Sequence, residues 1–249
     1  MNTFFRILLG VGVLCAPTVA MAADPTLGSA LEDVLSQAGA EETATSVRLI
    51  VLLTALTLLP ALVLAMTPFT RFIIVFSLLR QALGLQQSPP NQVLIGLSLA
   101  LSLLVMQPTL TKAYEQGVEP YMNGELGTAE AYDASIAPMR TFMLSNTSRD
   151  DLMTAMRLGR MSRPDTLAEV PTPVVLTGFL LSELRAALVI GIKVYIPFVM
   201  IDIVVASSLL GMGMMMLPPV VVSLPFKLLV FVLMDGWGLL VTGLAGGIR

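Results

Sequence analysis

The sequence contains no histidine. Histidine is the side chain that most often acts as a general acid or base near neutral pH, and it is the commonest ligand of transition metals. The sequence also has no phosphate-binding loop, no Ser/His/Asp set and no Cys/His cluster. We therefore expect no enzymatic activity, no cofactor and no metal site.

Charged residues are scarce as well. They make up 12% of the 249 residues, against about 25% in a typical soluble domain, whereas 55% of the residues are hydrophobic. The net charge of -3 is too small to indicate a nucleic acid or another strongly charged partner. This composition favours a protein that lies in a membrane or forms a massive interface with other proteins.

The first 22 residues have the pattern of a signal peptide. Arg6 supplies positive charge, residues 7–15 form a short apolar core, and Ala20-Met21-Ala22 fits the small-x-small rule for cleavage. The core is too short to span a bilayer, which needs around 20 apolar residues. We expect cleavage after residue 22, with an uncleaved anchor as the alternative. Cleavage removes Cys15, the only cysteine, so the mature chain would form no disulfide and no thiolate metal site.

Residues 47–110 indicate an apolar helical hairpin region. Val47–Met66 is long enough to cross a bilayer, and a second apolar run that starts at Val93 is expected to close near Pro108. Between them, Thr67–Gln92 carries two arginines and no acid, which predicts a cytoplasmic location by the positive-inside rule. The interior of this segment is apolar, so we expect a packed, re-entrant or interfacial helix.

Two other segments are polar enough to lie in water. Residues 23–46 are small, polar and acidic, and they predict a flexible periplasmic segment. Residues 111–173 mix acids and bases with tyrosines, and they predict a small helical domain. Within it, Ser148-Arg149-Asp150-Asp151 is a helix-start signal, because acids in the first turn interact favourably with the helix dipole. Since a cytoplasmic loop precedes this domain, we expect it on the periplasmic side.

The last segment, residues 174–249, is apolar but carries charges. Val174–Leu217 is far longer than one bilayer crossing at about 1.5 Å per helical residue. The chain then turns at Pro218-Pro219 and runs apolar to Leu244, interrupted by Pro225, Lys227, Asp235 and Gly236. A charge at bilayer mid-depth costs about 2.5–3.5 kcal/mol, so the charged side chains of this segment are expected to face protein or water. They are Glu183, Arg185, Lys193, Asp202 and Lys227.

Two interpretations of these charges remain open. A proton relay would use Glu183, Asp202 and Asp235, because intramembrane carboxylates often carry protons. Structural pairing inside an assembly is the alternative, and it is favoured because these three acids are matched by three bases, Arg185, Lys193 and Lys227. Glu183 and Arg185 are two residues apart and point to different helical faces, so each is expected to find its partner elsewhere.

The stretch GMGMMMLPP, residues 211–219, gathers four methionines: Met212, Met214, Met215 and Met216. Thioethers bind Cu(I), but successive side chains point away from each other, so one chain would struggle to converge all four sulfurs. Methionine also fills irregular gaps in a core. In an oligomer, several copies of a bent loop could form an apolar, deformable ring that closes a pore. The residues alone leave all three interpretations open.

Three long blocks are more specific than any periodicity. They are RFIIVFSLLRQALGLQQSPPNQVLIGL (Arg71–Leu97), IPFVMIDIVVASSLLGMGMMMLPP (Ile196–Pro219) and LPFKLLVFVLMDGW (Leu224–Trp237). Through them the chain resembles the FliP family, the export-gate subunits of the bacterial flagellar type III secretion apparatus, which are related to the SctR subunit of virulence injectisomes. The resemblance covers the chain from about Val47 to its end and is weakest in residues 111–173.

The resemblance implies an assembly. It implies that several copies, a pentamer, combine with FliQ and FliR into a closed helical channel in the inner membrane and flagellar basal body, partly on the periplasmic side, with FlhB and FlhA nearby. Unfolded flagellar export substrates would pass through this channel, the methionine loop would line it as a gasket, and the buried charges would face other subunits. The rival is a proton- or Cu(I)-coupled membrane transporter, which would work without those partners.

Overall fold

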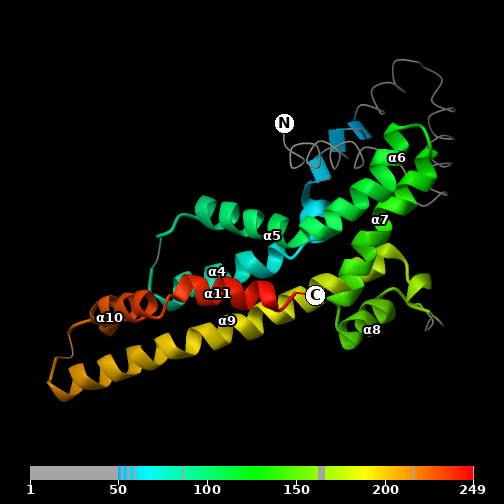
Figure 1. Ribbon diagram of the computed structural model, residues 1–249. Coiled ribbons are helices and arrows are strands. Elements are labelled where there is room, and N and C mark those ends of the chain that lie inside the picture. The colour runs from blue at the N-terminus through cyan, green and yellow to red at the C-terminus, as the bar shows by residue number, and fades with distance from the viewer. Residues whose placement is uncertain are drawn as a thin grey trace. The chain divides into compact units, whose positions relative to one another are not determined.

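The computed structural model describes residues 50–51, 53–54, 57–58, 60–85, 87–161, 166–214 and 216–248. Throughout these residues the regular structure is helical, without a strand, which confirms the expected all-α fold. The helices (Figure 1) are α4 (Phe69–Ala82), α5 (Asn91–Ala113), η1 (Tyr114–Val118), α6 (Glu119–Met122), α7 (Thr128–Ser145), α8 (Arg149–Leu158), η2 (Leu167–Glu169), α9 (Thr172–Gly211), α10 (Pro219–Leu233) and α11 (Gly236–Gly246). The expected signal peptide, the segment 23–46 and Met215 lie outside the described residues.

The chain forms two compact units. One contains the described residues up to Met66 together with Met106–Phe142, and the other contains Thr67–Val105 together with the chain from Met143 onward. The division differs from the segments expected from the sequence, because residues 111–142 belong to the first unit and residues 143–173 to the second. Helix α8 therefore shares a unit with α9.

The core of the second unit lies between α4 and α9. Apolar residues recur along α4 at the helical spacing of three and four, and Phe72, Val75, Phe76 and Leu79 are each at most 2% exposed. They form one cluster with residues of α9, α10 and α11: Ala187, Phe198, Phe231, Leu240 and Leu244. Full burial of such a side chain contributes about 1.5–3 kcal/mol to stability. The apolar interior of Thr67–Gln92 thus forms a packed helix.

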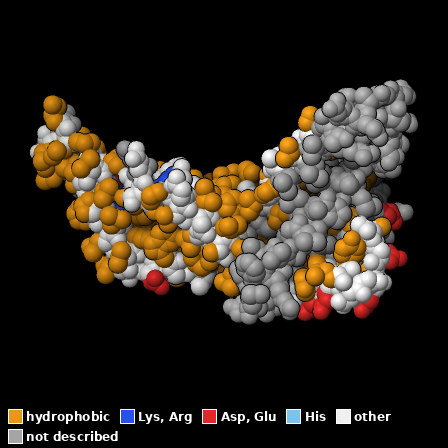
Figure 2. Space-filling model, turned by 90° about the horizontal axis from the view of Figure 1, so that it is seen from above, with side chains coloured by type: hydrophobic (Ala, Val, Ile, Leu, Met, Phe, Trp, Pro, Cys, Tyr) orange, Lys and Arg blue, Asp and Glu red, His pale blue; other side chains and the backbone are white. Residues whose placement is uncertain are grey.

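Helix α9 is 40 residues long. At about 1.5 Å per residue it spans roughly 60 Å, twice the thickness of a bilayer's hydrocarbon core. Two helical stretches of the described chain are long and apolar enough to cross a membrane, Asn91–Met122 and Thr172–Gly211, and the bent pair of α10 and α11 would make a third. Apolar side chains cover much of the surface on the left of Figure 2, where α9 and α10 lie in Figure 1.

The break between α10 and α11 falls at Asp235, one of the interruptions expected from the sequence, whereas Pro225 and Lys227 lie inside α10. Asp235 has a φ of 49°, in the left-handed region, and the two helix axes differ by 63°. A Cβ built on Gly238 would lie 2.3 Å from Oδ2 of Asp235, so the carboxylate lies over the first turn of α11. A carboxylate in this position interacts favourably with the positive end of the helix dipole.

The helix of the second apolar run continues beyond Pro108. Pro108 lies inside α5, which continues to Ala113 and then through the π-helix η1. A proline removes one backbone hydrogen bond and bends a helix, but it need not end one. In η1, Gly117 lies against α7 so closely that a Cβ there would be 2.6 Å from the carbonyl oxygen of Ala131.

The start of α8 confirms the helix-start signal. Ser148 is the N-cap, and Asp150 and Asp151 lie in the first turn. The backbone N–H of Ser148 donates a hydrogen bond of 2.9 Å to Oγ of Ser182 on α9. The hydroxyl of Ser182 in turn donates a hydrogen bond of 2.9 Å to Oδ2 of Asp151. The cap therefore also fixes α8 to α9.

Candidate functional site

The methionine loop, which we define as residues 212–218, joins α9 to α10 at the end of their hairpin (Figure 1). Helix α9 ends in a Schellman motif, in which the N–H of Gly213 donates to the carbonyl oxygen of Leu210 and the N–H of Met214 donates to that of Leu209. Gly213 has a φ of 77°, which only glycine adopts without strain. The end of α9 therefore turns at a fixed position, and Pro218 then caps α10.

The described methionines of this loop are exposed on the single chain. Met216 is 97% exposed, Met212 is more than half exposed, and Met214 is also exposed. Burying one such side chain would contribute about 1.5–3 kcal/mol, so the isolated chain leaves this stabilisation unused. The loop does not fill the core of its own chain.

The stem of this hairpin is held by Lys227. Its Nζ lies 2.6 Å from Oδ2 of Asp202 and donates to the carbonyl oxygen of Ala82 at 2.9 Å. The other carboxylate oxygen of Asp202 accepts a hydrogen bond of 2.5 Å from Oγ of Ser223. Lys227 is buried, whereas the Asp202 side chain is 31% exposed. This network joins α9, α10 and the last turn of α4.

A second ion pair lies deeper in the same unit. Arg71 on α4 forms a two-pronged pair with Glu183 on α9: its Nε donates to Oε2 at 2.8 Å and its Nη2 contacts Oε1. Nη1 donates to the carbonyl oxygen of Gly247 at 3.0 Å. Both charged side chains are almost completely buried. The planar guanidinium matches this geometry, which a lysine could not reproduce.

The remaining charges predicted for the site lie at the surface of the single chain. Arg185 is 60% exposed, and its Nη2 lies 2.6 Å from Oδ1 of the buried Asp151 on α8. Lys193 is exposed. Burial of Arg185 and Lys193 against other subunits stays a prediction.

The structure brings together some of the residues that the sequence singled out. Asp202 and Lys227 form a pair, but Glu183 and Arg185 each find a partner outside the predicted set, Arg71 and Asp151. Sequence reasoning assigned Arg71 to a cytoplasmic loop. Two signals could have shown the role of Arg71. It directly precedes Phe72 on the buried face of α4, and its segment has no acid with which it could pair.

The chemistry of this site is structural. Among the residues that the structure describes, no group of three or more His, Cys, Asp or Glu side chains is placed to hold a metal ion. The charged side chains tie helices to one another, and the soft, apolar side chains lie at the free end of the hairpin. This arrangement can present a deformable apolar surface on a rigid stem.

Comparison with known proteins identifies the family. The family model described as the FliP family matches residues 52–244, which is most of the chain. This chain belongs to the FliP family. The resemblance found in the three sequence blocks is thereby confirmed. Membership makes the chain a component of flagellar biosynthesis.

Individual relatives match this chain over most of their length. The chain is 44% identical over 229 residues to the flagellar biosynthetic protein FliP of Caulobacter vibrioides, which covers 92% of this chain and 86% of the relative. It is 42% identical over 212 residues to that of Bacillus subtilis, covering 85% of this chain and 96% of the relative. It is 46% identical over 224 residues to that of Pectobacterium carotovorum, covering 89% and 87%.

Proposed function

We propose that this chain is the pore-forming core subunit of the flagellar type III protein export gate. Unfolded flagellar substrates pass through a channel that several copies build across the inner membrane, and the methionine loops close this channel when it is empty. The observation that carries the proposal is the exposure of Met216, Met212 and Met214 at the end of a hairpin whose stem is fixed by Lys227.

The physical properties of the loop support this role. Methionine is unbranched and polarizable, so it repacks around neighbours of different shape. A ring of such side chains excludes water and ions by its apolar surface, and constrictions of this kind gate by dewetting. The same ring yields to a passing chain of any sequence because it makes no specific contact with it.

The size of α9 supports an assembly. A helix of about 60 Å exceeds the hydrocarbon core of about 30 Å, so part of its apolar surface needs cover by protein. Exposed apolar residues lie along it, among them Leu184, Leu188, Ile192 and Ile203. We assign this cover to further copies, a pentamer, and to FliQ and FliR, with FlhB and FlhA nearby and the core partly on the periplasmic side.

The test replaces the thioethers in assembled complexes. Substitution of Met214, Met215 and Met216 by Ala should let small ions leak through the closed gate, because shorter side chains leave the ring open. Substitution of all three by Leu should keep the gate tight to ions but slow export, because branched side chains rearrange less freely. Potassium efflux from cells and secretion of a flagellar substrate measure the two effects.

A matched control removes three exposed methionines that lie outside the loop: Met153, Met200 and Met234. Their replacement by Ala should cause no leak. The proposal fails if the loop variant stays tight to ions in assembled complexes, or if the control leaks equally. Ion flux through the chain in the absence of FliQ and FliR would support a transporter instead.

A further inference from the structure

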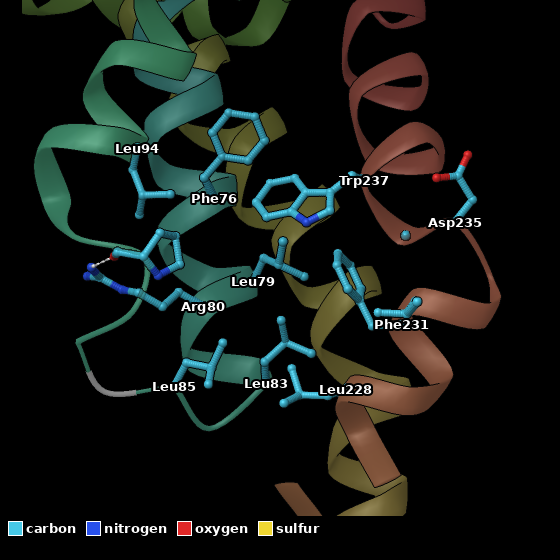
Figure 3. Close-up of a pocket in the computed structure, with 13 residues that line it drawn as sticks. Phe76, Leu79, Arg80, Leu83, Leu85, Leu94, Leu228, Phe231, Asp235 and Trp237 are labelled. Carbon is cyan, nitrogen blue, oxygen red and sulfur yellow. Dashed lines mark hydrogen bonds between the residues drawn. The ribbon is translucent and has the colours of Figure 1, made fainter. Parts of the chain in front are cut away.

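A cavity of about 290 Å³ lies in the second unit, between the end of α4, the last turns of α10 and the start of α11 (Figure 3). Its walls are mostly apolar. Leu79 comes from α4 and Leu83 from its C-cap, Leu228 and Phe231 come from α10, and Trp237 comes from α11. We call it the α10–α11 pocket.

Aromatic rings make one wall of the α10–α11 pocket rigid. The ring of Trp237 lies 5.7 Å from that of Phe231 in an edge-on arrangement and 6.0 Å from that of Phe76. Such ring pairs are stabilising by about 0.5–1.5 kcal/mol beyond their burial. Trp237 is still 41% exposed, so it lies at the mouth of the pocket as well as in its wall.

The interior of the pocket suits a hydrocarbon better than water. Its volume equals that of about ten water molecules at roughly 30 Å³ each. Cavities lined by Leu and Phe stay dry and take up apolar molecules, because buried water needs two to four polar partners. The interior can therefore hold a single unbranched apolar chain.

Arg80 supplies a fixed positive charge at one edge of the α10–α11 pocket. Its Nη1 donates to the carbonyl oxygen of Pro89 at 3.2 Å, the dashed line in Figure 3, and to Oδ1 of Asn91 at 2.7 Å. No acid within the described chain pairs with Arg80, in contrast to Arg71 and Lys227. Its Nε and Nη2 remain as donors for an anion.

The one acid of the pocket lining does not compete for this charge. Asp235 lies on the side of the pocket opposite Arg80, and its carboxylate points away from the interior (Figure 3). It lies over the first turn of α11, next to Gly238. The pocket thus combines an apolar interior with an unpaired cation at one edge.

We propose that the α10–α11 pocket binds an anionic phospholipid, with an acyl chain in the cavity and the headgroup phosphate on Arg80. Basic pockets between membrane helices bind acidic headgroups, and tryptophan is enriched at the level where headgroup and acyl chain meet. Arginine is also the side chain best suited to phosphate. This site lies apart from the methionine loop, so the proposal goes beyond the proposed function and does not depend on it.

Trp237 allows a direct test, because it is the only tryptophan of the whole chain. The full-length chain in detergent micelles is titrated with phosphatidylglycerol brominated on its acyl chains, and separately with phosphatidylcholine brominated in the same way. Bromine quenches tryptophan fluorescence at short range. Phosphatidylglycerol should reach half-maximal quenching at about fivefold lower concentration, since one basic residue contributes about 1 kcal/mol toward an anionic lipid.

Variants separate charge from structure. Arg80→Gln should remove the preference, so that both lipids quench alike, whereas Arg80→Lys should retain most of it. Lys193→Gln is the matched control, because it removes an exposed cation elsewhere in the same unit, and it should leave the preference unchanged. Circular dichroism checks that each variant keeps its helices.

Three results would overturn the proposal. Equal quenching of the unmodified chain by both lipids would mean that Arg80 does not select an anion. Absence of quenching by either lipid would mean that no acyl chain enters the pocket. Loss of preference in Lys193→Gln as large as in Arg80→Gln would mean that overall charge, not this pocket, attracts the lipid. None of these results bears on the export gate.

Discussion

Nζ of Lys227 lies 2.6 Å from Oδ2 of Asp202. The contact joins α10 to α9 just below the methionine loop, since Asp202 precedes the end of α9 by roughly two and a half turns. The same ammonium group also donates to the carbonyl oxygen of Ala82, so the hairpin is fixed to α4. One buried cation thus determines how the stem of the loop lies on the core.

The two partners of this pair should not be equally important for stability. Asp202→Leu leaves the buried ammonium of Lys227 with one carbonyl acceptor, and breaking a buried pair in this way costs about 3–5 kcal/mol. Lys227→Met leaves a carboxylate that water partly reaches and that Ser223 still supports, so we expect a cost nearer 1–3 kcal/mol. Thermal unfolding of the full-length chain in detergent, followed by circular dichroism, measures both.

The double variant Asp202→Leu/Lys227→Met tests whether Asp202 and Lys227 stabilise the chain by interacting with each other. It leaves no charge unpaired, so it should be more stable than Asp202→Leu alone, because an apolar replacement of a buried pair is often neutral. Equal stability of the double variant and Asp202→Leu would contradict a direct interaction. Lys193→Met, which removes an exposed cation of α9, should unfold within about 0.5 kcal/mol of the unmodified chain.

The buried pair of Arg71 and Glu183 should affect the end of the chain as well as the core. Glu183→Gln leaves Arg71 buried without a counter-charge, and we expect a loss of about 3–5 kcal/mol in the free energy of unfolding. Arg71→Met/Glu183→Leu should recover much of this loss. It cannot restore the hydrogen bond to the carbonyl oxygen of Gly247, so the end of α11 should stay loosened.

Carboxypeptidase digestion, read out by mass spectrometry, separates these two effects. The double variant should keep its helix content yet lose C-terminal residues faster than the unmodified chain. A C-terminus as resistant as that of the unmodified chain would show that Gly247 does not depend on Arg71.

Much of this architecture can be predicted from the sequence because its signals are local. The apolar spacing of Phe72, Val75 and Phe76 fixes which face of α4 is buried. The Pro218-Pro219 turn and the acids after Ser148 mark helix boundaries by the same local chemistry. Composition alone indicated that charges within apolar helices need partners.

The partners themselves could not be predicted, because pairing depends on distances between helices. Arg71 and Glu183 are 112 positions apart, and nothing in either segment specifies the other. The course of the helix past Pro108 could not be predicted for a related reason, since a proline's effect on a helix depends on what the neighbouring turns can absorb. The α10–α11 pocket is likewise a product of packing and leaves no sequence motif.

Gly191 lets α4 approach α9 closely. A larger residue there would crowd the contact, and a second substitution on α4 can relieve that crowding. A Cβ at Gly191 would lie 2.2 Å from Cδ1 of Leu78, so Gly191→Ala forces the leucine to move, and such overpacking costs about 1–3 kcal/mol. The obstacle is the end of one side chain, so Leu78→Ala removes it. The double variant should therefore be more stable than the sum of the two single losses predicts, by about 1–2 kcal/mol in thermal unfolding.

Gly96 on α5 is the control for the glycine itself, because a Cβ there would meet nothing within 4 Å. Gly96→Ala should be neutral or stabilising by up to about 1 kcal/mol, since alanine favours a helix over glycine. Strict additivity of Gly191→Ala and Leu78→Ala would show that α4 does not pack on α9 at this point. A loss from Gly96→Ala as large as that from Gly191→Ala would show that glycine is needed for flexibility instead of close packing.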